Sequence, residues 1–209
     1  MTGMDCRNEL VRLARSLHQR GLTRGTSGNL SARVDGGMLI TPTNASLGEL
    51  GTDDLALVSE TGDHLSGARP SKEAFLHLAM YKARPQDQAV VHLHSTYATA
   101  VSCLDNLDDH DVLPPLTAYF VMRVGRLTRL PYFAPGDQGL GEAAQRAALS
   151  SHALLLANHG PIVSALSLAQ AVDAAEEVEE TARLYLLLQG HATRPLQPEQ
   201  VARLAASRG

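Results

Sequence analysis

Two histidines separated by one residue form the most informative short pattern in the sequence. His92 and His94 flank Leu93 within an apolar stretch that we expect to form a strand. Alternate side chains of a strand point to the same face, so both imidazoles should project together. Two imidazoles on one rigid strand are suitable ligands for zinc and neighbouring transition metals. The alternative is a pair of half-buried or solvent-facing histidines that titrate and bind nothing.

Two further residues extend this candidate metal site. His159 follows the apolar run 153–156, which places it where a strand ends and a loop begins, although alone it is more typical of a plain turn. Glu73 falls in the first turn of an expected helix, where the helix dipole is by itself a sufficient reason for a carboxylate. Together Glu73, His92, His94 and His159 offer one oxygen and three nitrogens, a set that can hold a catalytic zinc ion.

Segments rich in hydroxyl and amide side chains form a second pattern. They are residues 26–29, residues 41–44 and the helix start after Pro70, where Ser71 is the expected N-cap. Exposed backbone N–H groups at such places bind anions. Turn formation and capping explain the same residues without any ligand, and the spacing does not decide between the two. A Walker loop and a dinucleotide-binding fingerprint are both absent from the sequence.

The expected elements interleave helices and strands without a strict alternation. Helices are expected from Asp5 to the residue before Gly21, from Lys72 onward, over 96–104, 139–151 and 167–189, and from Pro198 onward. Strands are expected over 30–34, 38–41, 55–59, 88–95, 129–132 and 153–157. This order predicts a mixed α/β fold with a partly antiparallel sheet.

Composition narrows the classes of function. A chain of 209 residues fits a single domain over 1–209, and 44% hydrophobic with 19% charged residues is typical of a globular protein. The net charge of −4 argues against nucleic-acid binding. Two cysteines, Cys6 and Cys103, suit a reducing cytoplasm, and neither a signal peptide nor a membrane span is expected.

The motifs, in their order along the chain, resemble those of the class II aldolase/adducin family. They are Thr26-Ser27-Gly28-Asn29, Thr41-Pro42-Thr43, Pro70-Ser71-Lys72-Glu73, His92-Leu93-His94 and Ala157-Asn158-His159-Gly160, within residues 5–190. The resemblance implies a three-layer α/β/α fold around a mixed, largely antiparallel sheet, usually in a homotetramer. It implies one zinc or similar divalent ion per subunit on the three histidines, and Glu73 as both an acid–base residue and a metal ligand. Phosphate binding is implied at Gly28, Asn29, Thr43, Asn44 and Ser71.

Within the family, three strings resemble the members that decarboxylate a 3-oxo-tetronate 4-phosphate. They are residues 41–48, 112–117 and 119–125. This resemblance implies that a phosphorylated sugar acid is converted to dihydroxyacetone phosphate and carbon dioxide through a metal-stabilised enediolate. Tyr119 is a candidate for assisting proton delivery, from a neighbouring subunit. Alternatives are a sugar-phosphate aldolase of the fuculose or ribulose type and a non-catalytic, adducin-like interaction module.

Lys72 departs from the aldolase pattern of the family. Fuculose- and ribulose-phosphate enzymes tend to carry a serine where this chain has Lys72. A lysine there adds a cation beside the phosphate site or the substrate carboxylate, which suits a doubly anionic substrate. The other possibility is that Lys72 points into solvent.

Overall fold

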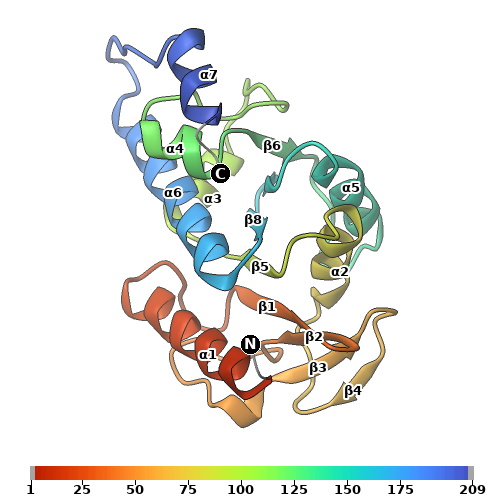
Figure 1. The fold of residues 1–209 in the computed structure, drawn as a ribbon. Helices are drawn as coiled ribbons and strands as arrows, with labels where there is room; N and C mark the ends of the chain where they lie inside the picture. The colour runs from red at the N-terminus through yellow and green to blue at the C-terminus, as the bar shows by residue number, and fades with distance from the viewer. Residues whose placement is uncertain (1–2, 207–209) are drawn as a thin grey trace.

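The computed structural model describes residues 3–206, and eight of its strands form one sheet (Figure 1). The strands are β1 (Asn29–Val34), β2 (Gly37–Ile40), β3 (Ala56–Ser59), β4 (His64–Ser66), β5 (Ala89–His92), β6 (Leu127–Leu130), β7 (Ala153–Leu156) and β8 (Gly160–Ala165). Their order in the sheet is β4-β3-β2-β1-β5-β8-β7-β6. All neighbours pair antiparallel except β6 and β7. The prediction of a mixed, largely antiparallel sheet is confirmed.

Helices cover both faces of this sheet. They are α1 (Gly3–Gln19), α2 (Ala74–Ala83), α3 (Thr96–Ser102), α4 (Ala118–Arg123), α5 (Gly139–Ala148), α6 (Leu168–Leu187) and α7 (Pro198–Ala206), with a 3-10 turn at Thr52–Asp54. In Figure 1, α1, α3 and α6 lie on one side of the strands, and α2 and α5 lie together on the other. The result is the predicted three-layer α/β/α arrangement. Within residues 3–206, none of the helices combines the length and the apolar composition that crossing a bilayer requires.

Two apolar cores fill the space between the sheet and the helices on its two sides. They show toward which side each residue of the central strands points. On β5, Val91 packs into the core beneath α1 and α6, whereas Val90 packs into the core beneath α2 and α5. Leu155 and Leu154 divide between the same two cores on β7. Since alternate residues of a strand face the same way, His92 must face the side of α2.

The structure differs from the predicted elements at several ends and adds three segments. β4, β8 and α4 were not predicted; β8 begins with Gly160-Pro161, a pair more typical of loops than of strands. The strand predicted over 88–95 ends at His92, and the helix predicted from Lys72 begins at Ala74.

Ser71 is not the N-cap that the sequence predicts. Glu73 occupies the N-cap position of α2, and Ser71 instead accepts the Glu73 backbone N–H at its Oγ, at 3.2 Å. The serine therefore stabilises the turn that leads into the helix. The reason is that the chain makes one extra turn after Pro70 before regular helical bonding starts.

Candidate metal centre

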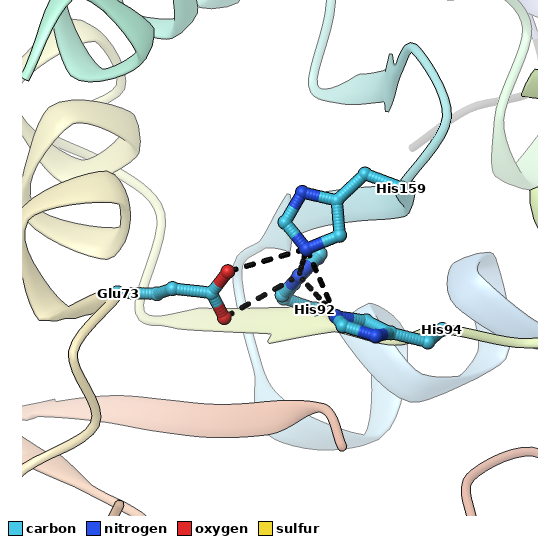
Figure 2. Close-up of side chains that lie close together, drawn as sticks. All are labelled: Glu73, His92, His94 and His159. Carbon is cyan, nitrogen blue, oxygen red and sulfur yellow. Dashed lines mark hydrogen bonds and ion pairs between the residues drawn. The ribbon is translucent and has the colours of Figure 1, made fainter. Parts of the chain in front are cut away.

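The four side chains predicted as metal ligands converge at one point (Figure 2). The Nε2 atoms of the three histidines form a triangle, with 3.2 Å between His92 and His94. The other two sides are 3.3 Å from His92 to His159 and 3.0 Å from His159 to His94. Glu73 lies alongside, with Oε1 3.3 Å from Nε2 of His159 and Oε2 3.5 Å from Nε2 of His92. The site thus contains four ligand atoms within 4.8 Å of one another.

This geometry fits a single metal ion. Two ligand atoms bound tetrahedrally to zinc are about 3.3 Å apart, close to the observed sides of the triangle. Hydrogen bonds cannot satisfy all three histidine contacts, because each needs a donor facing an acceptor and a triangle has an odd number of corners. One cation at the centre would satisfy every lone pair at once.

The sheet holds His92 in the orientation that a metal ligand needs. His92 is the last residue of β5, its side chain is fully buried, and Nδ1 donates to the Pro161 carbonyl at 2.8 Å. In the neutral ring, the proton on Nδ1 leaves the lone pair on Nε2, which faces the other ligands. The neighbouring strand therefore selects the tautomer of His92.

A tight turn between β7 and β8 presents His159. Asn158 adopts φ 56°, and Gly160 follows with φ 152°. A Cβ at Gly160 would lie 2.3 Å from the carbonyl oxygen of Leu93, so only glycine lets the two backbones approach this closely. The His159 carbonyl also accepts the Thr99 hydroxyl at 3.1 Å. These contacts fix His159 relative to the residues around His94.

The electrostatics of the site favour an ionised Glu73 and a neutral His94. Burial opposes ionisation of Glu73, but charge on His92 and hydrogen bonds from both His159 and Asn29 hold the pKa of the carboxyl far below its usual range. Burial also lowers the pKa of His92, yet the carboxylate outweighs it and raises that pKa overall. Burial and the two neighbouring histidines lower the pKa of His94 to about 4. A neutral His94 keeps its lone pair available for a cation.

The segments predicted to bind phosphate lie side by side next to Glu73. The Leu30 N–H donates to Oγ1 of Thr41 at 3.2 Å, which joins the end of the first segment to the second. The Ser71 N–H donates to the Thr41 carbonyl at 3.2 Å, which joins the second to the third. Residues 26–29, 41–44 and 70–73 are thus neighbours in the fold.

Individual residues of these three segments differ in exposure. Asn44 and Lys72 are exposed, Ser71 is buried, and Gly28 and Thr43 are half-buried. Gly28 has φ 78°, and a Cβ there would lie 3.0 Å from the His92 carbonyl oxygen. Phosphate binding by these residues stays a prediction.

Asn29 has a side-chain contact that sequence reasoning missed. It is predicted to bind phosphate, and that role is untested, but its Nδ2 donates to Oε2 of Glu73 at 2.7 Å. Its Oδ1 contacts Nε2 of His77 at 2.5 Å. The one available signal was the spacing of Glu73 and His77, four residues apart in an expected helix.

Tyr119 does not join the cluster within one chain. It lies on α4, its side chain is 61% exposed, and the Arg123 guanidinium carbon lies 5.2 Å from its ring centre. Across residues 3–206, no hydrogen bond or ring contact links it to Glu73 or to the three histidines. A role for Tyr119 in proton delivery stays a prediction, and it requires a neighbouring subunit.

Comparison with known proteins finds relatives of this chain both in sequence and in structure. Residues 8–186 match the family model of the class II aldolase and adducin N-terminal domain. A 3-oxo-tetronate 4-phosphate decarboxylase from Haemophilus influenzae is 48% identical over 202 residues, 96% of each chain. L-fuculose phosphate aldolase from Escherichia coli is 37% identical over 168 residues, 79% of this chain and 75% of the relative. The solved structure of YgbL from Klebsiella pneumoniae matches with a TM-score of 0.95 and 45% identity, covering 98% of this chain and 99% of that one. The fold, the converging ligands and these matches agree that the chain belongs to the class II aldolase and adducin family.

Proposed function

We propose that this protein decarboxylates a 3-oxo-tetronate 4-phosphate to dihydroxyacetone phosphate and carbon dioxide. The observation that carries the proposal is the convergence of Glu73 with three histidines at metal-ligand spacing. This site occurs in a chain 48% identical to a decarboxylase of that name over 96% of both lengths. We propose further that the protein is a single-domain, cytoplasmic homotetramer.

The proposed cofactor is zinc or another divalent transition metal, one per subunit. Glu73, His92, His94 and His159 are the residues that would hold it. When bound, such an ion acts as a Lewis acid toward oxygens that gain negative charge during the reaction. The pairing of Nδ1 of His92 with the Pro161 carbonyl keeps one ligand oriented before any metal arrives.

Glu73 is the residue proposed to move the proton. In a 3-oxo acid the C1–C2 bond breaks, carbon dioxide leaves, and the electron pair stays on C2 in conjugation with the C3 carbonyl. A proton must then be added at C2, and the Glu73 carboxyl is the acid–base group beside the ligand cluster. Tyr119 is proposed to assist this transfer from a neighbouring subunit.

The neighbouring segments 26–29, 41–44 and 70–73 are proposed to bind the phosphate. The last segment includes Glu73 and the first contacts its carboxylate through Asn29, so a phosphate there would hold the reacting carbons near the cluster. Gly28, Asn29, Thr43, Asn44 and Ser71 are the proposed contacts. The exposed ammonium of Lys72 adds positive charge for a substrate that carries a carboxylate as well as a phosphate.

A sugar-phosphate aldolase is the alternative, favoured by the 37% identity to L-fuculose phosphate aldolase. The same ligands and the same carboxylate suit retro-aldol cleavage, in which an aldehyde leaves instead of carbon dioxide. An adducin-like interaction module without chemistry has less support, because it has no need for a complete ligand set.

Direct turnover separates these functions. The zinc-loaded protein is incubated with 3-oxo-tetronate 4-phosphate, and both products are followed, with L-fuculose 1-phosphate in parallel and His94→Ala as the control. We expect equimolar dihydroxyacetone phosphate and carbon dioxide, absent from the control. Aldehyde release from the sugar phosphate alone would identify an aldolase.

Glu73→Gln tests the acid–base role, and the zinc content of the variant is measured alongside because Glu73 is also a proposed ligand. The amide keeps the size of the carboxyl group but cannot carry a proton, so turnover should fall by about 10²- to 10⁴-fold. Turnover within roughly tenfold of the wild-type rate would exclude Glu73 as the acid–base group.

A further inference from the structure

A row of hydrogen-bonded side chains connects Glu73 to the interior between β1 and α2. Asn29 donates to Oε2 of Glu73 at 2.7 Å and contacts Nε2 of His77 at 2.5 Å. Nδ1 of His77 lies 2.7 Å from Oγ of Ser31, which lies 2.9 Å from the Tyr81 hydroxyl. These five residues are named here the Glu73 chain.

The spacing of the Glu73 chain follows from its two elements. Asn29 and Ser31 are alternate residues of β1 and therefore share a face. His77 and Tyr81 are four residues apart on α2, so they share a face of that helix. Polar residues thus meet polar residues where β1 faces α2, between otherwise apolar layers.

The direction of each hydrogen bond in the Glu73 chain is determined by chemistry. An ionised carboxylate only accepts, so the amide of Asn29 must donate to it and turn its oxygen toward His77. Nε2 of His77 must then carry the hydrogen, and Nδ1 of the neutral ring must accept one from Ser31. Ser31 in turn accepts from Tyr81. Every donor therefore points toward Glu73.

Burial keeps this arrangement intact. Ser31 and His77 are fully buried, and Tyr81 and Asn29 are 3% and 5% exposed. Burial lowers the pKa of His77 to about 3, so its ring is neutral and cannot reverse the direction of the chain. The far end is anchored, because Arg33 donates to the Tyr81 carbonyl at 2.9 Å and its guanidinium carbon lies 4.4 Å from the Tyr81 ring centre.

We propose that His77 is a positioning residue, which holds Asn29 in the one orientation that fixes Oε2 of the Glu73 carboxylate. An apolar side chain at position 77 would pack α2 on β1 without the cost of burying an imidazole. What it would lack is a donor for Oδ1 of Asn29. Without that donor the amide can rotate, and its oxygen can face the carboxylate and repel it. The effect of His77 on turnover rests on the function proposed above, whereas its effect on the metal site does not.

The test compares two substitutions that keep or remove the donor to Asn29. In His77→Gln, the side-chain amide nitrogen reaches the position of imidazole Nε2 and keeps the donor. In His77→Asn, the shorter amide reaches only the position of Nδ1 and loses it. Both variants stay polar and uncharged. His77→Gln keeps the contact with Asn29 and loses the contact with Ser31, whereas His77→Asn does the reverse.

The main readouts are cobalt-loaded spectra and metal affinity, since neither needs a substrate. His77→Asn should change the visible absorption of bound Co²⁺ and weaken zinc binding, measured by chelator competition, by roughly 10- to 100-fold. His77→Gln should stay close to the wild-type protein in both. In turnover, kcat should fall in His77→Asn with little change in KM.

Leu17→Ala supplies a control for general loss of stability. Leu17 is fully buried in α1, in the core on the opposite face of the sheet. Its substitution should lower resistance to urea while leaving the Co²⁺ spectrum unchanged.

Equal spectra and equal zinc affinities for His77→Gln and His77→Asn would overturn the proposal and leave His77 a structural residue. A spectral change in Leu17→Ala as large as that in His77→Asn would also overturn it. If both substrates fail to react but the metal readouts separate the two His77 variants, the proposed function fails and the positioning role stands.

Discussion

The metal cluster and the Glu73 chain both reach the Glu73 carboxylate, and they differ in how their histidine nitrogens are paired. In the metal cluster, three Nε2 atoms face one another at 3.0–3.3 Å, and hydrogen bonds cannot pair all three of them. In the Glu73 chain, each nitrogen of His77 meets a partner of the opposite kind. The cluster therefore needs a cation to be complete, whereas the chain is already complete.

Burial does not account for this difference. His92 and His77 are both fully buried, yet the neighbouring carboxylate raises the pKa of His92 while burial lowers that of His77 to about 3. The two histidines differ in the group that Nε2 contacts. In His92 it contacts other histidine nitrogens, and in His77 it contacts the amide oxygen of Asn29. A buried histidine near a carboxylate is thus a ligand or a support according to the direction of its hydrogen bonds.

The largest effect is expected from removing one of the three histidines of the metal cluster. His159→Ala removes one of the four proposed ligands, so zinc should bind more weakly and turnover should fall by about 10³-fold or more. Metal content after dialysis and product formation are the measurements. His191→Ala, at an exposed position after α6, is the control and should retain metal. A zinc affinity in His159→Ala equal to that of the wild-type protein, measured by chelator competition, would remove His159 from the ligand set.

Stiffness around the cluster is tested by Gly160→Ala. A Cβ at this position would lie 2.3 Å from the Leu93 carbonyl, so the backbone between His94 and His159 must move. We expect a loss of about 1–3 kcal/mol in the free energy of unfolding, measured in urea, together with weaker zinc binding. Gly136→Ala is the matched control, because Gly136 also has positive φ but no atom lies within 4 Å of its added Cβ. Equal losses in both variants would show that the close contact at Gly160 is unimportant.

The pH dependence of stability should show that the Glu73 chain contains a buried, neutral His77, since a purely apolar contact would not titrate. The pKa of His77 is about 3 in the folded chain, whereas an unperturbed imidazole, as in the unfolded chain, has a pKa of 6.5. Between these two pH values only the unfolded chain binds the proton. Stability must therefore fall as the pH falls from 6.5 toward 3, by up to about 1.4 kcal/mol per pH unit. Groups facing the ring include Asn29, Ser31 and Tyr81, with charge from Glu73 and His92.

The measurement is urea unfolding of metal-free wild-type protein and His77→Gln at pH 7 and pH 5. Because glutamine does not titrate, the wild-type protein should lose about 2 kcal/mol more than the variant between these two pH values. A difference that does not depend on pH would mean that the folded protein tolerates a charged His77.

Much of the cluster was predictable because its ligands belong to short, local patterns. Strand alternation places His92 and His94 on one face, and although β5 ends at His92, their Nε2 atoms still meet at 3.2 Å. The turn at His159 follows an apolar run visible in the sequence. Local chemistry therefore predicted the ligand candidates and a partly antiparallel sheet, and the family resemblance predicted the three-layer fold with its largely antiparallel sheet.

The Glu73 chain was not predictable in the same way. Its residues meet only because β1 lies next to β5, with α2 packed across them, and no local pattern determines that order. Asn29 is typical of a turn or an anion-binding loop, and nothing near it in sequence indicates a partner 48 residues away. β8 escaped detection because Gly160 and Pro161 are residues typical of loops, although here the glycine allows the close approach to Leu93.

The smallest effect is expected at the far end of the Glu73 chain. Tyr81→Phe removes the donor to Ser31 but leaves the bonds from Ser31 to His77, from His77 to Asn29 and from Asn29 to Glu73. Since the carboxylate sets the direction of those bonds, only about 0.5–1.5 kcal/mol of stability should be lost, measured in urea. The Co²⁺ spectrum should change less than in His77→Asn. If Tyr81→Phe disturbed the spectrum as strongly as His77→Asn, the five side chains would act as one cooperative unit, and the sharp contrast with the metal cluster would fail.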